Sequence, residues 1–293
     1  MNPEAGRGTL YVVGTPIGNL DDLSFRALEV LRGSALIACE DTRRTRAILA
    51  RHGMKTRLLS YHKFNESGRC EVILAALREG KGVALVSDGG TPGISDPGAL
   101  LVRRARQEGI HVVPVPGPSA LTALLSASGL PPGPFTFIGF LPHRQGERRR
   151  LLSALRAEPR PLVFFESPHR ILAALQDALE ILGDRHAVLG REMTKVHEEF
   201  LAGTLGAVRE TLGRRPVKGE IAFLVAGADE AEARRTTGDA PPSDEPAARA
   251  VRRLVAAGCD RKEALRRVAR ERGLSRREVY RQVLRAAQDG EEE

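Results

Sequence analysis

Residues 10–20 read Leu10-Tyr11-Val12-Val13-Gly14-Thr15-Pro16-Ile17-Gly18-Asn19-Leu20. A short apolar run is followed directly by a turn that contains glycine and proline. Glycine at the carboxyl end of a strand lets the backbone approach a ligand, and open parallel sheets bind their ligands at that edge. The stretch therefore predicts a buried strand that ends in a ligand-binding turn.

The same alternation of apolar runs and helical patterns continues to the middle of the chain. Helical patterns at Leu23–Leu31, Thr45–Arg51 and Val72–Glu79 separate the apolar runs. Continuously apolar strands that alternate with helices are typical of a parallel sheet buried on both faces. Residues 1–130 are therefore expected to form an N-terminal α/β lobe, with further strands at Ala35–Cys39, Leu58–Ser60, Val83–Ser87 and Val112–Val115.

A proline-rich break at Leu130–Pro134 ends this pattern, because proline neither donates a ladder hydrogen bond nor continues a helix. Residues 131–228 are expected to form a second α/β lobe with helices at Arg148–Ala157 and His169–Leu182. Its strands are predicted at Phe135–Phe140, Leu162–Phe165, Ala187–Gly190 and Ile221–Val225, with a further strand near Glu199–Leu201.

The C-terminal part of the chain differs in composition. Residues 229–245 contain few large apolar side chains, as expected of a linker. Residues 246–290 are rich in arginine and are predicted to form a basic module of three short helices that resembles a helix-turn-helix. Its predicted apolar stripes are Val251, Leu254 and Val255, then Leu265, Val268 and Ala269, then Val279, Val283 and Leu284.

Two helix starts in this module carry a capping signature. Asp260 with Glu263, and Ser275 with Glu278, have the spacing at which a side chain and a glutamate satisfy each other's free amides. Gly273 is expected to supply the turn between these helices. The module either contacts nucleic acid or packs on the body or on a partner subunit.

The composition excludes several classes of protein. No apolar stretch approaches the roughly 18 residues that a membrane span requires, and a secretory signal is not expected. The three cysteines are far apart, so neither a disulfide framework nor a zinc site is expected. We expect a cytoplasmic protein without a required metal.

The net charge of +8 suggests contact with a polyanion. An arginine-rich solvated surface is the alternative explanation of that charge. Aromatic residues make up only 4% of the chain, which favours phosphate contacts over a stacking platform.

Two further loops follow predicted strands. One reads Ser87-Asp88-Gly89-Gly90-Thr91-Pro92-Gly93-Ile94-Ser95-Asp96-Pro97-Gly98, and the other reads Pro116-Gly117-Pro118-Ser119-Ala120. A glycine-rich loop costs conformational entropy on folding and is therefore expected to wrap a ligand. Ser119 is expected to cap a helix whose free amides face that ligand. The spacing matches neither the dinucleotide-binding fingerprint nor a P-loop.

Together with E-D-T-R at Glu40–Arg43, F-E-S-P-H-R at Phe165–Arg170, G-R-E-M-T-K at Gly190–Lys195 and K-G-E at Lys218–Glu220, these loops form an ordered series. The series resembles the tetrapyrrole methylases, and within them the branch that 2′-O-methylates a cytidine, cytidine 1402, of 16S ribosomal RNA. The resemblance implies a two-lobed class III fold, S-adenosylmethionine as methyl donor in the cleft between the lobes, the small ribosomal subunit as partner, and a homodimer.

The resemblance also implies which residues hold the cofactor. They are Pro16 of the first loop, Asp88, Gly89, Gly90, Thr91 and Ile94 of the second, Ser119 and Ala120 of the third, and Glu166. Thr91 stands where the precorrin-type relatives have aspartate. This departure favours an RNA substrate over the rival interpretation, a precorrin or uroporphyrinogen methylase.

A ribose hydroxyl is a poor nucleophile, so a general base is expected. The candidates are unranked: Glu40, Asp41, Glu166, His169 and Lys195, with Asp88 and Glu220 in the same motifs. RNA contacts are expected at Arg43, Arg44, Arg46, Arg276 and Arg277. A second set either meets RNA phosphates or forms a solvated helix face: Arg144, Arg148, Arg149 and Arg150. A non-catalytic ribosome- or RNA-binding factor with the same fold is a further alternative.

Overall fold

The computed structural model describes residues 8–228, 246–256, 258–271 and 274–288. The expected linker at 229–245 and the expected turn at Gly273 lie outside these residues. No helix in the described ranges is long and apolar enough to cross a membrane.

The first half of the chain forms a five-stranded sheet in the order β3-β2-β4-β1-β5. All neighbouring strands are parallel, as the continuous apolar runs predict. All five carboxyl ends therefore lie at one edge. The strands are β1 (Thr9–Val13), β2 (Leu36–Cys39), β3 (Leu58–Ser60), β4 (Val83–Val86) and β5 (His111–Val115).

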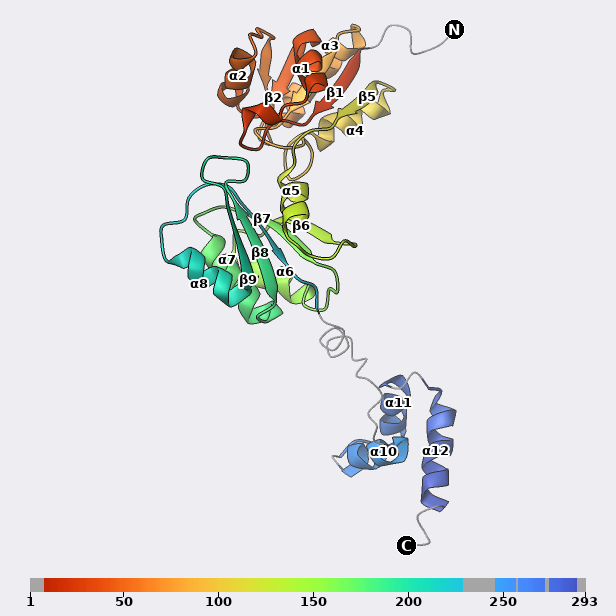
Figure 1. Ribbon diagram of the computed structural model, residues 1–293. Coiled ribbons are helices and arrows are strands. Elements are labelled where there is room, and N and C mark those ends of the chain that lie inside the picture. The colour runs from red at the N-terminus through yellow and green to blue at the C-terminus, as the bar shows by residue number, and fades with distance from the viewer. Residues whose placement is uncertain (1–7, 229–245, 257, 272–273, 289–293) are drawn as a thin grey trace.

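Helices cover both faces of this sheet (Figure 1). Side chains of α1 (Phe25–Gly33) and α2 (Thr42–Arg51) pack in one buried cluster, which includes Leu31 and Ile48. Side chains of α3 (Glu66–Arg78) and α4 (Ala99–Gln107) pack in another, which includes Ile73 and Leu101. Helix α4 was not expected, because its polar face carries several arginines and its apolar face is short.

The second half forms another five-stranded sheet, in the order β6-β7-β10-β8-β9. It is mixed: β6 and β7 are parallel, whereas β10 is antiparallel to both β7 and β8, and β9 is antiparallel to β8. The strands are β6 (Thr136–Phe140), β7 (Leu162–Glu166), β8 (His186–Arg191), β9 (Glu199–Thr204) and β10 (Ile221–Val225).

The helices α6 (Gln145–Ala154), α7 (Ile171–Leu182) and α8 (Leu205–Gly213) bury one face of the second sheet. Its other face is covered by α5 (Ala120–Ala127), whose Leu124 is fully buried against strand residues such as Val163. Helix α5 thus follows the first sheet in the chain but packs on the second. The expected boundary at residue 130 remains a proposal.

The three C-terminal helices are α10 (Ala247–Ala256), α11 (Arg261–Glu271) and α12 (Arg276–Gln288), and they pack on one another (Figure 1). The Ser275 hydroxyl donates to the Glu278 carboxylate at 2.6 Å, and the Ser275 backbone N–H donates to it at 2.8 Å, as the capping signature predicts. Most of the expected apolar stripe is buried. Val255 and Leu284 are exceptions, 40% and 42% exposed, because three short helices bury only a narrow seam.

Candidate functional site

Three loops at the carboxyl edge of the first sheet hold one another. Thr15 and Gly90 exchange backbone hydrogen bonds of 2.9 and 3.0 Å, which join the loop after β1 to the loop after β4. A Cβ atom on Gly117 would lie 2.7 Å from the carbonyl oxygen of Gly14, so only glycine permits the close approach of the loops after β1 and β5. The glycines therefore bring three separate segments into one surface.

A cavity of about 330 Å³ lies between this surface and the strand ends of the second sheet. The size falls within the range of small-molecule sites. Of the residues expected to hold a cofactor, Asp88, Gly89, Gly90, Thr91, Ile94, Ser119, Ala120 and Glu166 line it. Pro16 does not line the cavity, although its carbonyl oxygen lies 3.3 Å from where a Cβ of Gly89 would be.

Much of the cavity wall was not expected from the sequence to hold a cofactor, although Arg44 and Glu220 were named for other roles. Several of these residues belong to the recognised motifs, but the motifs alone do not say which side chains face inward. The additional lining residues are Ile17, Arg44, Ser95, Asp96, Phe140, Phe165, Ser167, Pro168, Met193, Gly219, Glu220, Ile221 and Ala222. Ser119 precedes α5 as expected, but its side chain makes no capping hydrogen bond.

Glu166 ends β7 with its side chain fully buried. Its Oε1 atom accepts a hydrogen bond from the backbone N–H of Ser167 at 2.7 Å and forms an ion pair with Arg170 at 2.5 Å. Its Oε2 atom is buried and has no hydrogen-bond partner. Because an unsatisfied buried acceptor costs about 1–3 kcal/mol, this oxygen is suited to a donor from a ligand in the cavity.

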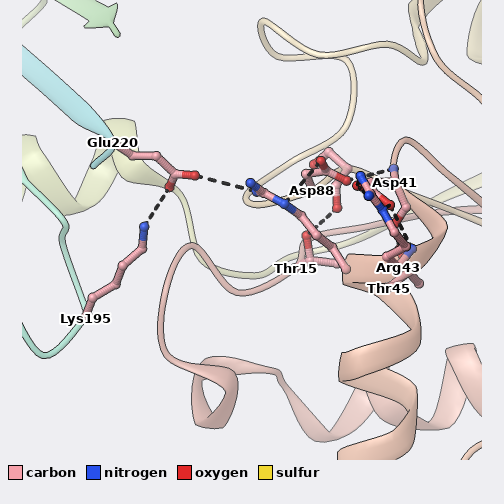
Figure 2. A network of polar contacts seen from close by, with 9 residues as sticks. Thr15, Asp41, Arg43, Thr45, Asp88, Lys195 and Glu220 are labelled. Atoms are coloured by element: carbon pink, nitrogen blue, oxygen red, sulfur yellow. Dashed lines mark hydrogen bonds and ion pairs between the residues drawn. The ribbon is translucent and has the colours of Figure 1, made fainter. Parts of the chain in front are cut away.

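A polar network crosses from the first sheet to the second along the cavity wall (Figure 2). The Asp88 carboxylate accepts from the backbone N–H of Asp41 at 2.9 Å. Arg44 lies 3.7 Å from both Asp88 and Glu220. Glu220 in turn lies 3.3 Å from the Nζ atom of Lys195. The network therefore links segments that are far apart in the chain.

Lys195 also donates to Glu192 at 2.6 Å. Burial acts to lower the pKa of its ammonium group, but the carboxylates of Glu192 and Glu220 outweigh burial and raise that pKa. The sequence makes Lys195 one candidate base, but a lysine whose pKa is raised keeps its proton and is poorly suited to that role.

Asp96 is the titratable group of the cavity that sequence reasoning missed. Burial, supported by the nearby charges of Glu40, Asp88 and Glu220, raises its pKa to about 6, although a hydrogen bond from Ser87 acts in the opposite direction. Among the described residues no cation lies within ion-pairing distance of it. Its loop was quoted from the sequence, but the pKa depends on burial that only the fold creates.

The other expected bases do not line the cavity. Asp41 caps α2, accepting from the backbone N–H of Arg43 at 2.8 Å, and the hydrogen bonds from Arg43 hold its pKa at about 2. His169 is exposed on the loop before α7. The pKa of Glu40 is raised, mainly by burial and then by Asp88. No group of three or more His, Cys, Asp or Glu side chains in the described ranges could hold a metal ion.

The arginines expected to contact RNA divide into two groups. Arg43, Arg44, Arg46, Arg276 and Arg277 are exposed. Arg148, in contrast, is 5% exposed and pairs with Asp177 at 2.6 Å, where Arg149 also binds at 2.7 Å. Arg148 therefore does not contact phosphate, because its guanidinium group forms a buried ion pair that joins α6 to α7.

Sequence comparison places this cavity in a known family. The model of the tetrapyrrole (corrin/porphyrin) methylases matches residues 9–209. A relative from Halalkalibacterium halodurans, named ribosomal RNA small subunit methyltransferase I, is 43% identical over 275 residues, which cover 94% of each chain. A relative of the same name from Micromonospora olivasterospora is 45% identical over 290 residues, covering 97% of this chain and 89% of its own.

Solved structures agree on the fold. A cobalt precorrin-4 methyltransferase superposes with a TM-score of 0.56 at 19% identity, covering 74% of this chain and 94% of that one. A uroporphyrin-III C-methyltransferase from Thermus thermophilus, complexed with S-adenyl homocysteine, gives 0.54 at 22% identity, covering 74% and 97%. The two-sheet architecture and the contacts between the glycine loops agree with these matches. The chain therefore belongs to the tetrapyrrole methylase family, and within it groups with the relatives named ribosomal RNA small subunit methyltransferase I.

Proposed function

We propose that this chain transfers a methyl group from S-adenosylmethionine to the ribose 2′-oxygen of a cytidine, cytidine 1402, in 16S ribosomal RNA. The observation that supports it most is the identity of 43–45% over nearly the whole chain to relatives named for small-subunit ribosomal RNA. Those relatives also suggest the small subunit as partner. The homodimer implied by the family resemblance is proposed with it, and light scattering of the purified chain measures it.

The cavity fits the proposed cofactor. Gly89, Gly90 and Ser119 of the glycine loops line it, and the buried Oε2 atom of Glu166 has no donor among the described residues. An adenosine ribose or amino group supplies such a donor. When bound, the cofactor supplies an activated methyl group on a sulfonium. The residues of this chain then have to align the acceptor with that methyl group and exclude water.

We assign the removal of the hydroxyl proton to Asp96. Of the carboxylates that line the cavity, Asp88 and Glu220 face Arg44, and Glu166 pairs with Arg170. Asp96 has no such cation in the part of the chain that the structure describes, and with a pKa of about 6 it is ionised at neutral pH while still binding a proton better than an ordinary aspartate. A base poised in this way gives efficient proton transfer.

Substitution of Asp96 tests this assignment. The Asp96→Asn variant is expected to lose about 100-fold or more in methyl transfer, the usual contribution of a general base, while its affinity for S-adenosylhomocysteine stays unchanged. The wild-type rate should rise with pH through about 6 and the residual rate of the variant should not. Asp21→Asn is the matched control, because Asp21 is exposed and pairs only with Arg51 in the described chain. A variant that keeps the wild-type pH profile would contradict the assignment.

Substitution of Glu166 tests the cofactor site. Glu166→Gln presents an amide in place of an acceptor oxygen, and we expect S-adenosylhomocysteine to bind about 10- to 100-fold more weakly by calorimetry, the loss of one hydrogen bond to a charged group. Glu210→Gln, at an exposed pair with Arg214, should bind like the wild type. Melting without ligand verifies that Glu166→Gln is folded.

The rival functions give different results in the same assays. A precorrin or uroporphyrinogen methylase would methylate a tetrapyrrole and leave ribosomal RNA unmodified. A non-catalytic factor would bind small subunits and the cofactor but transfer nothing.

A further inference from the structure

Phe64 is an exposed aromatic side chain between β3 and α3. Its side chain is 84% exposed although the ring is large and apolar. The Nζ atom of Lys63 lies 4.8 Å from the ring centroid, and the ring of His62 approaches it edge-on with centroids 6.0 Å apart. The ring is thus accompanied by a cation and a second ring, although nothing covers it in the described chain.

The turn that carries Phe64 is tightly hydrogen-bonded. The side chain of Asn65 accepts from the backbone N–H of His62 at 2.8 Å and donates to the carbonyl of Ser60 at 3.2 Å. The carbonyl of His62 accepts from the backbone N–H groups of Asn65 and Glu66 at 2.9 and 3.0 Å. The chain therefore holds the ring in solvent at a defined place, which lowers the entropy cost of binding a partner there.

Strand register places this turn beside the cavity. Cys39 of β2 pairs with Ser60 of β3 on one side and with Val86 of β4 on the other. The segments that follow these strands begin at Tyr61 after β3, at Glu40 after β2 and at Ser87 after β4. They therefore start next to one another at the same edge of the sheet. The turn is two strand spacings, roughly 10 Å, from the loop that contains Asp88 and lines the cavity.

A cation beside the ring suits an RNA-binding surface. Lys63 lies over the ring and is exposed, and Arg69 of α3 is exposed as well, whereas Arg43, on the segment after β2, is already paired with Asp41 at 2.7 Å. Every nucleobase has a flat face that stacks on an aromatic ring, and cations beside that ring meet the phosphates. An apolar protein partner would be a poor match for a single ring beside a lysine.

We propose that Phe64 stacks on a base of the RNA next to the methylated nucleotide, with Lys63 at the adjoining phosphate. This inference rests on the proposed function, since it takes ribosomal RNA as the substrate. It also adds a stacking contact to a chain whose low aromatic content predicts phosphate contacts alone. The ring helps to orient the substrate at the cavity mouth without touching the reacting atoms.

The test measures binding of isolated small ribosomal subunits by filter binding, separately from methyl transfer. Phe64→Ala is expected to raise the Kd about 5- to 150-fold, corresponding to one stacked base, whereas Phe64→Tyr, which keeps the ring, should bind like the wild type. Affinity for S-adenosylhomocysteine and the rate at saturating subunits should stay unchanged in both variants.

Phe25→Ala is the matched control. Phe25 is 88% exposed, but its neighbour Arg26 reaches the carbonyl of Pro114 in β5, the strand at the opposite edge of the sheet from β3. Equal Kd values for Phe64→Ala and wild type would overturn the inference, as would a change in oligomeric state that assigns the ring to a second copy of the chain. A wild-type protein that binds subunits through Phe64 without methylating them would overturn only the proposed function.

Discussion

Asp96 shows how the fold changes the chemistry of one residue. Its pKa in the folded chain, about 6, is above the value of 3.8 for a free aspartate, so the folded state binds the proton more tightly than the unfolded state. The stability that this proton binding contributes is complete below about pH 4 and is lost as the pH rises through 6. At neutral pH the ionised carboxylate therefore destabilises the fold.

Asp96→Asn removes this penalty at neutral pH. Because the side chain is partly exposed, we expect a gain of only about 1 kcal/mol, which corresponds to roughly 2–4 °C in melting temperature. The difference from wild type should be present at pH 7.5 and should shrink at pH 4.5. Calorimetric melting at both values measures it, and a gain of equal size at the two values would show that Asp96 is not the cause.

Individual site residues were predictable where a motif defines them. Asp88 and Glu166 were expected at the cavity and line it. Glu220 was named as a candidate in its motif and lines the cavity, whereas Asp96 acquires its role from burial and from neighbours distant in sequence, which no local pattern contains. The expected RNA contact of Arg148 was wrong for the same reason. Its buried partner Asp177 lies on another helix, and the arginine-rich stretch around Arg148 does not reveal that pairing.

At the scale of elements, the glycine loops after β1, β4 and β5 fold correctly only as a set. Their contact is closest at Gly14 and Gly117, where a side chain on either residue would collide with the backbone of the other. Backbone atoms cannot move aside as the end of a flexible side chain can. The geometry of the cavity thus depends on backbone contacts between residues that have no side chain to bind a ligand or take part in catalysis.

Gly117→Ala tests this dependence. The added methyl group would lie 2.7 Å from the carbonyl oxygen of Gly14, and we expect about 1–3 kcal/mol of destabilisation in urea together with weaker cofactor binding. Gly68→Ala, in α3 with nothing within 4 Å of the new atom, should be neutral or stabilise by about 0.5–1 kcal/mol. Equal unfolding free energies for the two variants would contradict the proposed contact.

Strands were predicted better than helices. Strands such as β2, β4 and β10 are compact apolar runs, and burial on two faces makes such runs visible in the sequence. The mixed pairing of the second sheet was not visible, because parallel and antiparallel central strands have the same composition. The packing of α5 on the second sheet was also not predictable. It depends on the path of the chain between the sheets, and the spacing of apolar residues in the sequence does not reveal that path.

At the scale of the whole molecule, a cofactor cavity in the body is combined with a separate basic bundle. Arg276 and Arg277 open α12 and are exposed, as RNA contact requires. The fold explains how the three helices hold together through their apolar seam. Their role in RNA binding remains a proposal that charge alone suggests.

Joint replacement of Arg276 and Arg277 by glutamine tests the role of the bundle. Each lost phosphate contact should reduce the slope of log affinity against log salt by about 1 and weaken binding for all RNA sequences alike. Filter binding of small subunits at several salt concentrations gives that slope. Arg214→Gln, at an exposed arginine paired with Glu210, is the control. Unchanged affinity and slope would assign the bundle to another partner.

In the proposed function, the two lobes, the cavity and the exposed arginines serve one reaction at a ribose oxygen. The most direct test incubates the purified chain with isolated small subunits that lack the modification and an S-adenosylmethionine whose methyl group is isotopically labelled, followed by mass spectrometry of the digested nucleosides. We predict labelled 2′-O-methylcytidine and no label on any base. Label on a base, or none in the RNA, would contradict the proposed function.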